Sequence, residues 1–276
     1  MTSLDGCFYQ LYRQTSYACS KRVIIVSGGA NPLNNQEKIV QLKIWIDEAD
    51  RIVILTGAGV STESGLKDFR SEDGIFTDEE PIEYYLSRDY FNRNPEEFWE
   101  NYKKTFQLEH LHTYEPNLAH TFFAELERSG KRGTIITQNV DGLHQKAGSK
   151  NVIEVHGTVT NATCLDCGKH FDFNHIMKTD LPVCSDCGQI LDPDIVLYGD
   201  AIHGWHEAEK SVRDADLFLV MGTSLSVTPV NMFPAIAEQA GVQRKVLLNN
   251  ESTIMNRYFD LFIEEKLGVI FEAISK

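Results

Sequence analysis

The sequence predicts an α/β fold: a domain built on a parallel β-sheet, with a small metal-binding domain inserted in it. Short apolar segments alternate with amphipathic helical segments along most of the 276 residues, which is typical of a parallel sheet covered by helices on both faces. Several apolar segments end in a glycine-rich or polar turn, where ligands of such sheets bind. Between about residues 158 and 193, two close cysteine pairs interrupt the pattern and place the insertion.

The first 35 residues differ from the rest of the chain. They are polar and aromatic without a clear period, and they end in a Gly- and Asn-rich segment, residues 27–35, which is typical of a linker. We therefore expect a flexible N-terminal extension at residues 1–35 and the main domain at residues 36–276.

The first half of the main domain begins with a helix over residues 35–49, where Ile39, Leu42 and Ile46 recur at helical spacing. Residues 51–55 then predict a buried strand that runs into a glycine turn. By the same criteria we expect helices at residues 81–86, 95–106 and 117–128, a polar loop at 71–80, and strands at 134–137 and 152–155.

The second half continues the alternation after the cysteine pairs. We expect an extended segment at residues 195–198, helices at 204–214, 230–240 and 267–274, and strands at 217–221, 246–248 and 261–263. One large domain with an insertion fits this length.

Charge and composition narrow the range of functions. The formal net charge of −14 disfavours binding to nucleic acid, because affinity for phosphates comes from Lys and Arg, and it favours basic segments as partners. No apolar run reaches the roughly 18 residues of a membrane helix, and no basic stretch precedes an apolar core at the N-terminus. We expect no membrane association and a cytoplasmic location.

Four of the six cysteines follow the pattern Cys164-x2-Cys167-x16-Cys184-x2-Cys187. Two C-x2-C pairs at this spacing are typical of tetrahedral zinc, and a glycine follows each pair where the chain must turn. Because four thiolates fill the coordination sphere, we expect one structural Zn2+. The alternative is a redox dithiol pair, which the presence of two pairs together disfavours.

Two segments after the first strand suit a nucleotide. The turn GAGVSTESG at residues 57–65 follows that strand directly, and its small residues let backbone N–H groups approach a pyrophosphate. It departs from G-x-G-x-x-G because Thr62 replaces the third glycine, and a plain strand-to-helix turn is the alternative. Asp68-Phe69-Arg70 suits a ribose phosphate and nicotinamide, although a surface ion pair explains it equally well.

Two further turns follow the strands at residues 134–137 and 152–155. TQNVDGLH, residues 137–144, gathers amides and a carboxylate at a strand end, with a helix-capping turn at Asp141 as the alternative. His156 follows the next strand, and an imidazole of ordinary pKa suits proton transfer near neutrality. A satisfied core or surface histidine is the alternative. His144 is the rival base, which we expect to be a structural partner on a helix.

Two segments near the C-terminus carry small polar groups at strand ends. GTSLSV, residues 222–227, follows the strand at 217–221, and Asn249 follows the strand at 246–248. Hydroxyls and an amide in these positions suit phosphate and ribose hydroxyls. Each is weak evidence alone, but together they place polar groups on one edge of the sheet.

In this order, GAGVSTESG, DFR, TQNVDGLH, EVHG, the paired C-x2-C, GTSLSV and LLNN resemble the sirtuin family. The resemblance runs from about Gln36 to the C-terminus and is greatest to the sirtuins of Gram-positive bacteria. It implies a Rossmann-like domain with an inserted zinc ribbon and substrate bound between them. It also implies an NAD-dependent protein-lysine deacylase: acyl-lysine and NAD give nicotinamide, free lysine and O-acyl-ADP-ribose, as the amide oxygen attacks the nicotinamide ribose.

The resemblance also implies roles for single residues. His156 matches the general base that deprotonates a ribose hydroxyl, and Gln138 and the catalytic Asn139 sit by that ribose. Val140, in place of the commoner Ile, and Asp141 hold the carboxamide. The other expected cofactor contacts are Ala58, Thr62, Phe69 over the nicotinamide pocket, Arg70, Thr223, Ser224, Asn249 and, near adenine, Leu267.

Three positions depart from the family pattern. Lys67 stands where Pro is usual, which predicts a looser cofactor loop, and IVLYGD at residues 195–200 replaces the usual apolar-Phe-Gly-Glu strand beside the substrate. Relatives that prefer acidic acyl groups carry Tyr-x-x-Arg, whereas here Tyr102 is followed by Thr105. We therefore expect uncharged acyl groups to be preferred, although the two intervening lysines are nearby substitutes.

Two other functions share some of these features. A mono-ADP-ribosyltransferase also begins with loss of nicotinamide from NAD, so the motifs do not separate it from a deacylase. A non-enzymatic zinc-ribbon binding module is disfavoured by the intact His156 and Asn139.

Overall fold

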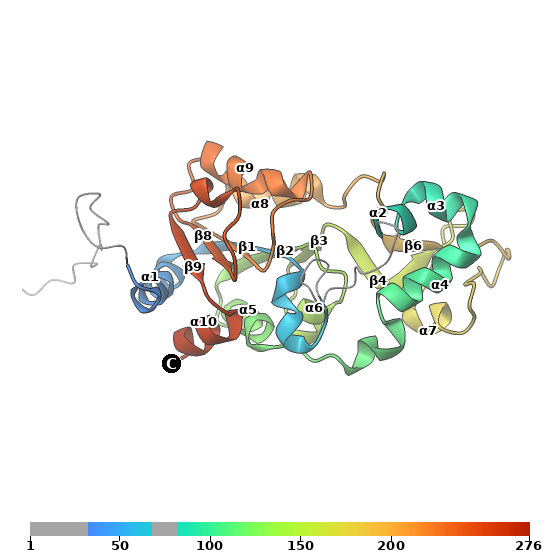
Figure 1. Ribbon diagram of the computed structural model, residues 1–276, viewed down its shortest axis with the longest axis horizontal. Coiled ribbons are helices and arrows are strands. Elements are labelled where there is room, and N and C mark those ends of the chain that lie inside the picture. The colour runs from blue at the N-terminus through green and yellow to red at the C-terminus, as the bar shows by residue number, and fades with distance from the viewer. Residues whose placement is uncertain (1–32, 68–81) are drawn as a thin grey trace, which may run out of the picture. The chain divides into compact units, whose positions relative to one another are not determined.

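A computed structural model describes residues 33–67 and 82–276. Within them, six parallel strands form one sheet in the order β3-β2-β1-β7-β8-β9 (Figure 1). The strands are β1 Arg51–Thr56, β2 Arg132–Thr137, β3 Val152–Glu154, β7 Leu217–Met221, β8 Lys245–Asn249 and β9 Leu261–Glu264. The strand order reverses between β1 and β7, and the carboxyl ends of strands at such a reversal flank the ligand crevice of α/β sheets.

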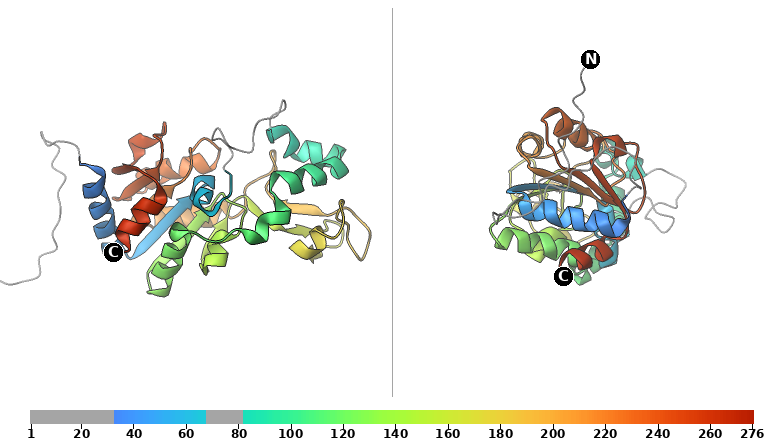
Figure 2. Two further views of the ribbon diagram at one scale, coloured as in Figure 1. Left: turned by 60° about the horizontal axis from the view of Figure 1, so that its bottom comes forward. Right: turned by 90° about the vertical axis from the view of Figure 1, so that its left-hand side faces the viewer.

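Helices bury both faces of this sheet. In β1, Ile52 and Ile54 belong to one core cluster and Val53 and Leu55 to the other, because successive side chains point to opposite faces. The first face is covered by α1 Asn35–Glu48, α5 Leu118–Arg128 and α10 Leu267–Ile274, and the second by α8 Trp205–Arg213 and α9 Phe233–Gln239 (Figures 1 and 2). No helix in the described ranges has the length and hydropathy that spanning a membrane requires.

A smaller unit is inserted between β3 and α8. Within the described residues its antiparallel sheet has the order β5-β4-β6 and carries the short helix α7. The elements are β4 Gly157–Thr163, β5 His170–Phe171, α7 Phe173–Ile176 and β6 Asp192–Ile195. A second chain segment packs on this sheet through Phe98, Trp99 and Tyr102. It contains α2 Ile82–Tyr85, α3 Arg88–Arg93 and α4 Pro95–Thr105.

The observed elements confirm most of the sequence predictions to within two residues. Helix α3 is an exception that the periodicity did not predict: Ser87 caps it by accepting the Tyr90 N–H, and it ends at Asn94 before Pro95. The expected extended segment at residues 195–198 is also different, because β6 ends at Ile195 and only Tyr198 pairs further on, with Ser87. The predicted polar loop at residues 71–80 lies outside the described residues.

The turns after β1 and β7 touch each other. Gly57 N–H donates to the Met221 carbonyl over 3.1 Å, and Gly59 N–H donates to the Gly222 carbonyl over 2.9 Å. A Cβ on Gly57 would lie 2.7 Å from the Gly222 oxygen, and one on Gly222, whose φ is +59°, would lie 2.4 Å from the Val60 nitrogen. Only glycine fits such crowded positions, so the small residues of both turns form the floor of the crevice.

Replacing Gly222 by Ala should therefore destabilise the protein more than its backbone angle alone explains. The left-handed conformation costs an L-residue about 1–2 kcal/mol, and the clash with the turn after β1 adds to this. Gly241→Ala is the control, because Gly241 has φ +76° but nothing within 4 Å of its added Cβ. Thermal melting of both variants measures the difference, and equal losses would contradict the interlocking of the two turns.

Candidate active site

A cavity of about 530 Å³ lies at the carboxyl ends of β1, β2, β7 and β8. Its wall on the other side comes from α2 and from the segment after β6, residues 195–200. Nine of the residues singled out in the sequence line it: Ala58, Thr62, Gln138, Asn139, Val140, His156, Thr223, Ser224 and Asn249. The fold therefore brings together motifs that are up to 191 positions apart, as expected for strand ends on one edge.

His156 lies two residues after the end of β3 and directly before β4, between the sheet and the inserted unit. Its Nδ1 is 3.1 Å from the Gln138 carbonyl oxygen. A carbonyl only accepts, so Nδ1 carries the proton and Nε2 keeps a lone pair. Burial lowers the pKa of His156, the Gln138 carbonyl opposes this, and His203 adds to it. The ring is therefore neutral at neutral pH and suited to accept a proton at Nε2.

The backbone beside His156 is held by close packing. A Cβ on Gly157 would lie 1.9 Å from the Asp194 carbonyl oxygen in β6, so β4 and β6 are in contact immediately after the histidine. Only a glycine permits this approach, and the position of His156 is thereby tied to the inserted sheet.

Asn139, Ser61 and Asp141 form a hydrogen-bonded group at one end of the cavity. Asn139 Nδ2 donates to Ser61 Oγ over 3.1 Å, and Ser61 Oγ donates to Asp141 Oδ2 over 2.6 Å. Burial raises the pKa of Asp141, while Ser61 and the Leu143 N–H oppose the shift. Asp141 lines a smaller cavity of about 50 Å³ that shares Ala58 with the large one.

Asp141 also holds the turn before α6, Leu143–Ala147. Its Oδ1 accepts the Leu143 N–H over 2.9 Å, as the capping alternative predicted, although the N-cap position itself is Gly142. One carboxylate thus serves both the helix start and the smaller cavity.

Leu267 is placed differently from the prediction. Its side chain is 6% exposed and packs in the core cluster beneath the sheet, and it does not line the large cavity. It belongs to the apolar stripe that α10 turns toward the core with Ile270, Phe271 and Ile274. The predicted contact with adenine stays a prediction, and the burial of the side chain in the core is an additional role. The predicted contacts Phe69 and Arg70 lie outside the described residues.

His144, the rival base, lines neither of the two cavities. It is 1% exposed, and its Nε2 lies 3.1 Å from Thr56 Oγ1. Burial, with a smaller contribution from the charge of His120, lowers its pKa to about 3. An imidazole with this pKa and no access to the cavity is a structural group, as the sequence predicted.

The paired cysteines converge in the inserted unit. Their sulfur atoms all lie within 4.8 Å of one another, with separations of 3.5, 3.6 and 4.0 Å for three of the pairs. Gly168 and Gly188 have φ near +72° and donate their N–H groups to the carbonyls of Cys164 and Cys184. The two halves are therefore equivalent turns that present four sulfurs to one point.

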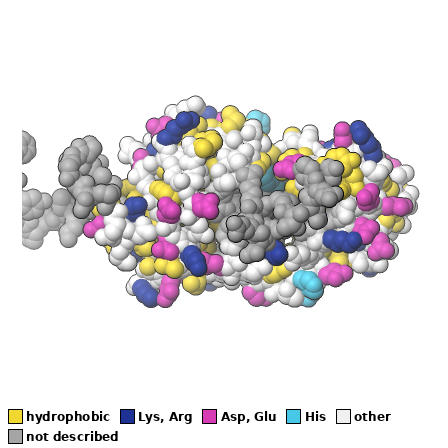
Figure 3. All heavy atoms as spheres, in the orientation of Figure 1, with side chains coloured by type: hydrophobic (Ala, Val, Ile, Leu, Met, Phe, Trp, Pro, Cys, Tyr) yellow, Lys and Arg dark blue, Asp and Glu magenta, His cyan; other side chains and the backbone are white. Residues whose placement is uncertain are grey.

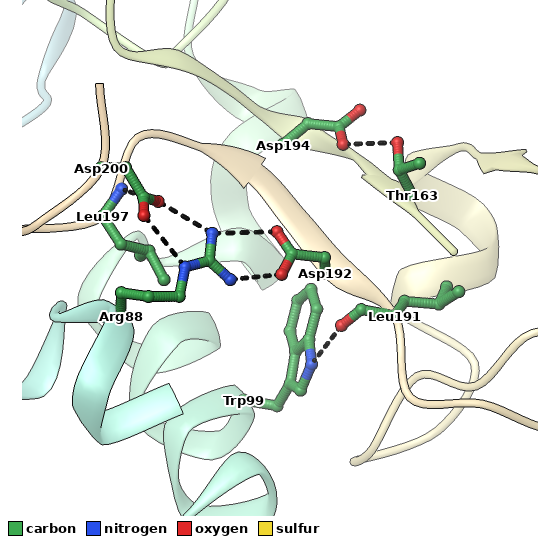
Figure 4. A network of polar contacts seen from close by, with 8 residues as sticks. All are labelled: Arg88, Trp99, Thr163, Leu191, Asp192, Asp194, Leu197 and Asp200. Carbon is green, nitrogen blue, oxygen red and sulfur yellow. Dashed lines mark hydrogen bonds and ion pairs between the residues drawn. The ribbon is translucent and has the colours of Figure 1, made fainter. Parts of the chain in front are cut away.

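Arg88, which the sequence analysis missed, joins the inserted unit to the cavity wall (Figure 4). Its guanidinium pairs with Asp192 at the start of β6 and, over 2.8 Å, with Asp200. Asp200 also accepts the Leu197 N–H over 3.2 Å, and the Arg88 N–H donates to the Tyr198 carbonyl over 3.0 Å. These bonds fix the segment that lines the cavity opposite the sheet. No local signal marks Arg88 in the sequence, because the short helix α3, RDYFNR, carries other polar and charged side chains.

The chain belongs to the Sir2 family. Residues 57–229 match the model of that family, described as "Sir2 family". An NAD-dependent protein deacetylase of Bacillus cereus (strain ZK / E33L) is 45% identical over 239 residues, which cover 87% of this chain and 97% of the relative. NAD-dependent protein deacetylase 2 of Geobacillus kaustophilus (strain HTA426) is 46% identical and covers 87% and 98%. The predicted resemblance to sirtuins of Gram-positive bacteria is confirmed.

Solved sirtuin structures confirm the fold. A Sir2 structure from a study of the mechanism and regulation of Sir2 enzymes is 37% identical, with a TM-score of 0.75 over 87% of this chain and 98% of that one. A complex of Sir2 with a p53 peptide and NAD+ is 32% identical, with a TM-score of 0.74 over 85% and 95%. The parallel sheet with an inserted small unit is thus the sirtuin architecture.

Replacing Arg88 by Met should destabilise the protein by about 1–3 kcal/mol, because it leaves two partly buried carboxylates unpaired. Burial raises the pKa of Asp200, but the pairing with Arg88 outweighs it, so the net pKa is lowered. The stabilisation is therefore fully present above the unfolded pKa of about 3.9 and is lost progressively as pH falls from there through the lowered pKa of the folded state.

Denaturant unfolding at pH 7 and pH 3 measures this contribution. Arg93→Met is the matched control, because Arg93 lies on the same helix and its ion pair with Asp89 is exposed. A loss for Arg88→Met no larger than for Arg93→Met at pH 7 would contradict the bridging role.

Proposed function

We propose that this sirtuin is an NAD-dependent protein-lysine deacylase that acts on acetyl-lysine or longer uncharged acyl-lysine. The observation that carries the proposal is the orientation of His156: its Nδ1 is held by the Gln138 carbonyl, and its ring lines the same cavity as Asn139 and the nucleotide turns. A neutral imidazole fixed in this way supplies the general base that the reaction requires.

In this proposal NAD binds at the carboxyl edge of the parallel sheet. The interlocked turns line the cavity with Gly57, Ala58, Gly59 and Gly222, and these small residues let a pyrophosphate approach that surface closely. Thr223 and Ser224 lie on the phosphate side, and Asn249 at the end of β8 on the side of the second ribose. These groups bind and orient the co-substrate but do not take part in proton transfer.

The opposite end of the cavity receives the nicotinamide and its ribose. The Asn139 side chain is oriented by Ser61, which in turn is held by Asp141. Val140 and Asp141 line the smaller cavity. A carboxamide bound there fits the backbone amide of Val140 and the side-chain carboxylate of Asp141. Once nicotinamide leaves and the acyl oxygen bonds to the ribose, His156 Nε2 removes the proton from a neighbouring ribose hydroxyl.

The acyl-lysine enters from the side of the inserted unit. Three carboxylates line the large cavity, Glu83, Asp200 and Glu251, and its described lining contains no Lys or Arg. Acidic and basic side chains are interspersed on the surrounding face (Figure 3). This electrostatic setting suits a neutral acyl group on a chain with basic neighbours, and it disfavours an acyl carboxylate.

We infer that the four cysteines hold a structural Zn2+. With Zn–S bonds of about 2.3 Å, a tetrahedron has S–S edges of about 3.8 Å, and three of the sulfur pairs, at 3.5, 3.6 and 4.0 Å, bracket this value. Four sulfurs leave no coordination position for substrate, so bound zinc would stabilise the inserted unit that carries Asp192 and the cavity wall.

Product analysis tests the proposed reaction. Incubation with NAD and an acetyl-lysine peptide should yield the peptide with free lysine, nicotinamide and O-acetyl-ADP-ribose in equal amounts, as measured by mass spectrometry. Protein or peptide that gains ADP-ribose while its acetyl group stays in place would instead identify a mono-ADP-ribosyltransferase.

His156→Ala should lose about 10²–10⁴-fold in deacetylation rate, the usual contribution of a general base. Because burial lowers the pKa of His156 below 6.5, wild-type activity should fall only as pH drops through that lower value. NAD affinity should change far less. His206→Ala, an exposed histidine on α8, is the control. A well-folded His156→Ala enzyme with near wild-type turnover would remove His156 from the mechanism.

Cys184→Ala should release the metal and disorder the inserted unit, because structural zinc contributes on the order of 10 kcal/mol to folding in small peptides. Elemental analysis of the wild type should give one zinc per chain. Ser185→Ala is the neighbouring control. Full activity and solubility of a metal-free preparation would contradict the structural role.

Acetyl-lysine should be processed at least about tenfold better than succinyl-lysine, because an unpaired carboxylate in the cavity costs desolvation energy. The two lysines near Thr105 are engaged elsewhere: Lys103 donates to the Thr179 carbonyl and Lys104 pairs with Glu100. Thr105→Arg should narrow the difference. The measurement is kcat/KM for both peptides, and a succinyl value equal to or above the acetyl value would overturn the expectation.

A further inference from the structure

Two threonines at the ends of β1 and β2 form a buried polar chain behind the cavity. Thr56 and Thr137 are opposite each other in the sheet and are at most 2% exposed. Thr56 Oγ1 donates to Thr137 Oγ1 over 2.8 Å. The backbone N–H of Asn139 donates to the same Thr137 oxygen over 3.0 Å. Thr137 therefore connects the central strand to the backbone of a cavity residue.

His144 stands at the far end of this chain. Its Nε2 lies 3.1 Å from Thr56 Oγ1. A hydroxyl has a single proton, and Thr56 gives that proton to Thr137, so Thr56 must accept from His144. The proton of the neutral imidazole is therefore on Nε2. His144 Nδ1 has no hydrogen-bond partner among the described protein atoms, so the contact with Thr56 alone selects this tautomer.

Burial keeps the histidine in the neutral form that this arrangement uses. The ring of His120 on α5 lies 4.8 Å from that of His144, and both are at most 1% exposed. With its one proton on Nε2, the neutral imidazole donates to Thr56, Thr56 donates to Thr137, and Thr137 also accepts the Asn139 N–H.

We propose that His144 and Thr56 are positioning residues for Asn139. The hydrogen-bonded chain from His144 through Thr56 to Thr137 holds the backbone of Asn139. The position of this backbone then sets where the Asn139 side chain, which donates to Ser61, lies in the cavity. This inference rests on the proposed function only for the role of Asn139 beside the ribose. Neither His144 nor Thr56 lines the large cavity or the smaller one.

The expected effect follows from the environment of the chain. In a low-dielectric interior, linked hydrogen bonds strengthen one another, and removing one member leaves a buried group unsatisfied. A displacement of about 1 Å in a group that orients substrate costs up to about 10²-fold in rate. Loss of the Thr56 hydroxyl should therefore act on turnover more than on the binding of NAD, because Thr223, Ser224 and Asn249 at the ends of β7 and β8 do not depend on this chain.

Two matched pairs of variants test the proposal. Thr56→Val removes the hydroxyl at nearly constant shape, and Thr56→Ser keeps it. His144→Gln keeps an amide N–H near the position of Nε2, and His144→Asn is too short to reach Thr56. Ser149→Ala is the control, since Ser149 is a buried serine after α6 whose hydroxyl makes no hydrogen bond to described protein atoms.

The first measurement needs no activity: amide hydrogen exchange of the Asn139 N–H in the folded protein. Thr56→Val and His144→Asn should accelerate this exchange about tenfold, as expected for the loss of about 1.4 kcal/mol of protection. Thr56→Ser, His144→Gln and Ser149→Ala should stay within about threefold of the wild type. Unchanged exchange in Thr56→Val would overturn the proposal whether or not the protein is a deacylase.

The second measurement is deacetylation of an acetyl-lysine peptide, normalised to folded protein. Thr56→Val and His144→Asn should lower kcat about tenfold with KM for NAD changed less than about threefold, and the two conservative variants should recover most of the loss. If the melting temperature falls while kcat per folded molecule is unchanged, the residues are merely structural and the proposal is wrong.

Discussion

The contact between the turns after β1 and β7 is the constraint on which the rest of the structure depends. The sheet reverses its strand order at this point, and the two turns approach so closely that Gly57 and Gly222 have no room for a side chain. The turn after β1 is also held by α10, because Glu63 in this turn accepts the Gly268 N–H over 3.0 Å. The shape of the proposed nucleotide site is therefore set by the packing of the backbone, and side chains contribute at its edge.

The wall of the cavity opposite the sheet is held by ion pairs and by one close backbone contact. Charge pairing through Arg88 and the backbone contact at Gly157 attach the segment after β6 to α3 and β4. His156 lies where the two walls meet, after the last short strand on that edge of the sheet and before the first strand of the inserted unit. Under the proposed function, this position lets one imidazole face a nucleotide on one side and an acyl-lysine on the other.

Sequence reasoning predicted a residue's position well where that position follows from its place at the end of a strand. Nine of the expected contacts line one cavity because parallel strands end on one edge. It failed where position depends on packing between distant segments. Leu267 is part of the apolar stripe of α10. The helical periodicity of this stripe predicts the burial of Leu267, which the family motif does not. Arg88 has no local pattern, since its partners Asp192 and Asp200 are over a hundred residues away.

The buried polar groups also have positions that depend on contacts between distant segments. His144 was expected to be structural because it falls on a helix after a polar turn, and it is buried against Thr56. The direction of its hydrogen bond depends on the pairing of Thr56 with Thr137 across two strands, and no spacing rule reveals such a pairing. Sequence patterns therefore identify the strand ends, whereas the contacts between them decide which polar groups face substrate and which hold the site in place.

The most direct test of the account is the exchange of labelled nicotinamide into NAD by wild-type and His156→Ala protein in the presence of an acetyl-lysine peptide. Exchange reports reversible loss of nicotinamide, before the step that needs the base. We expect the variant to keep exchange within about tenfold of the wild type while deacetylation falls by about 10²–10⁴-fold. Equal losses of exchange and deacetylation would contradict the role of His156 as a base that acts after nicotinamide has left.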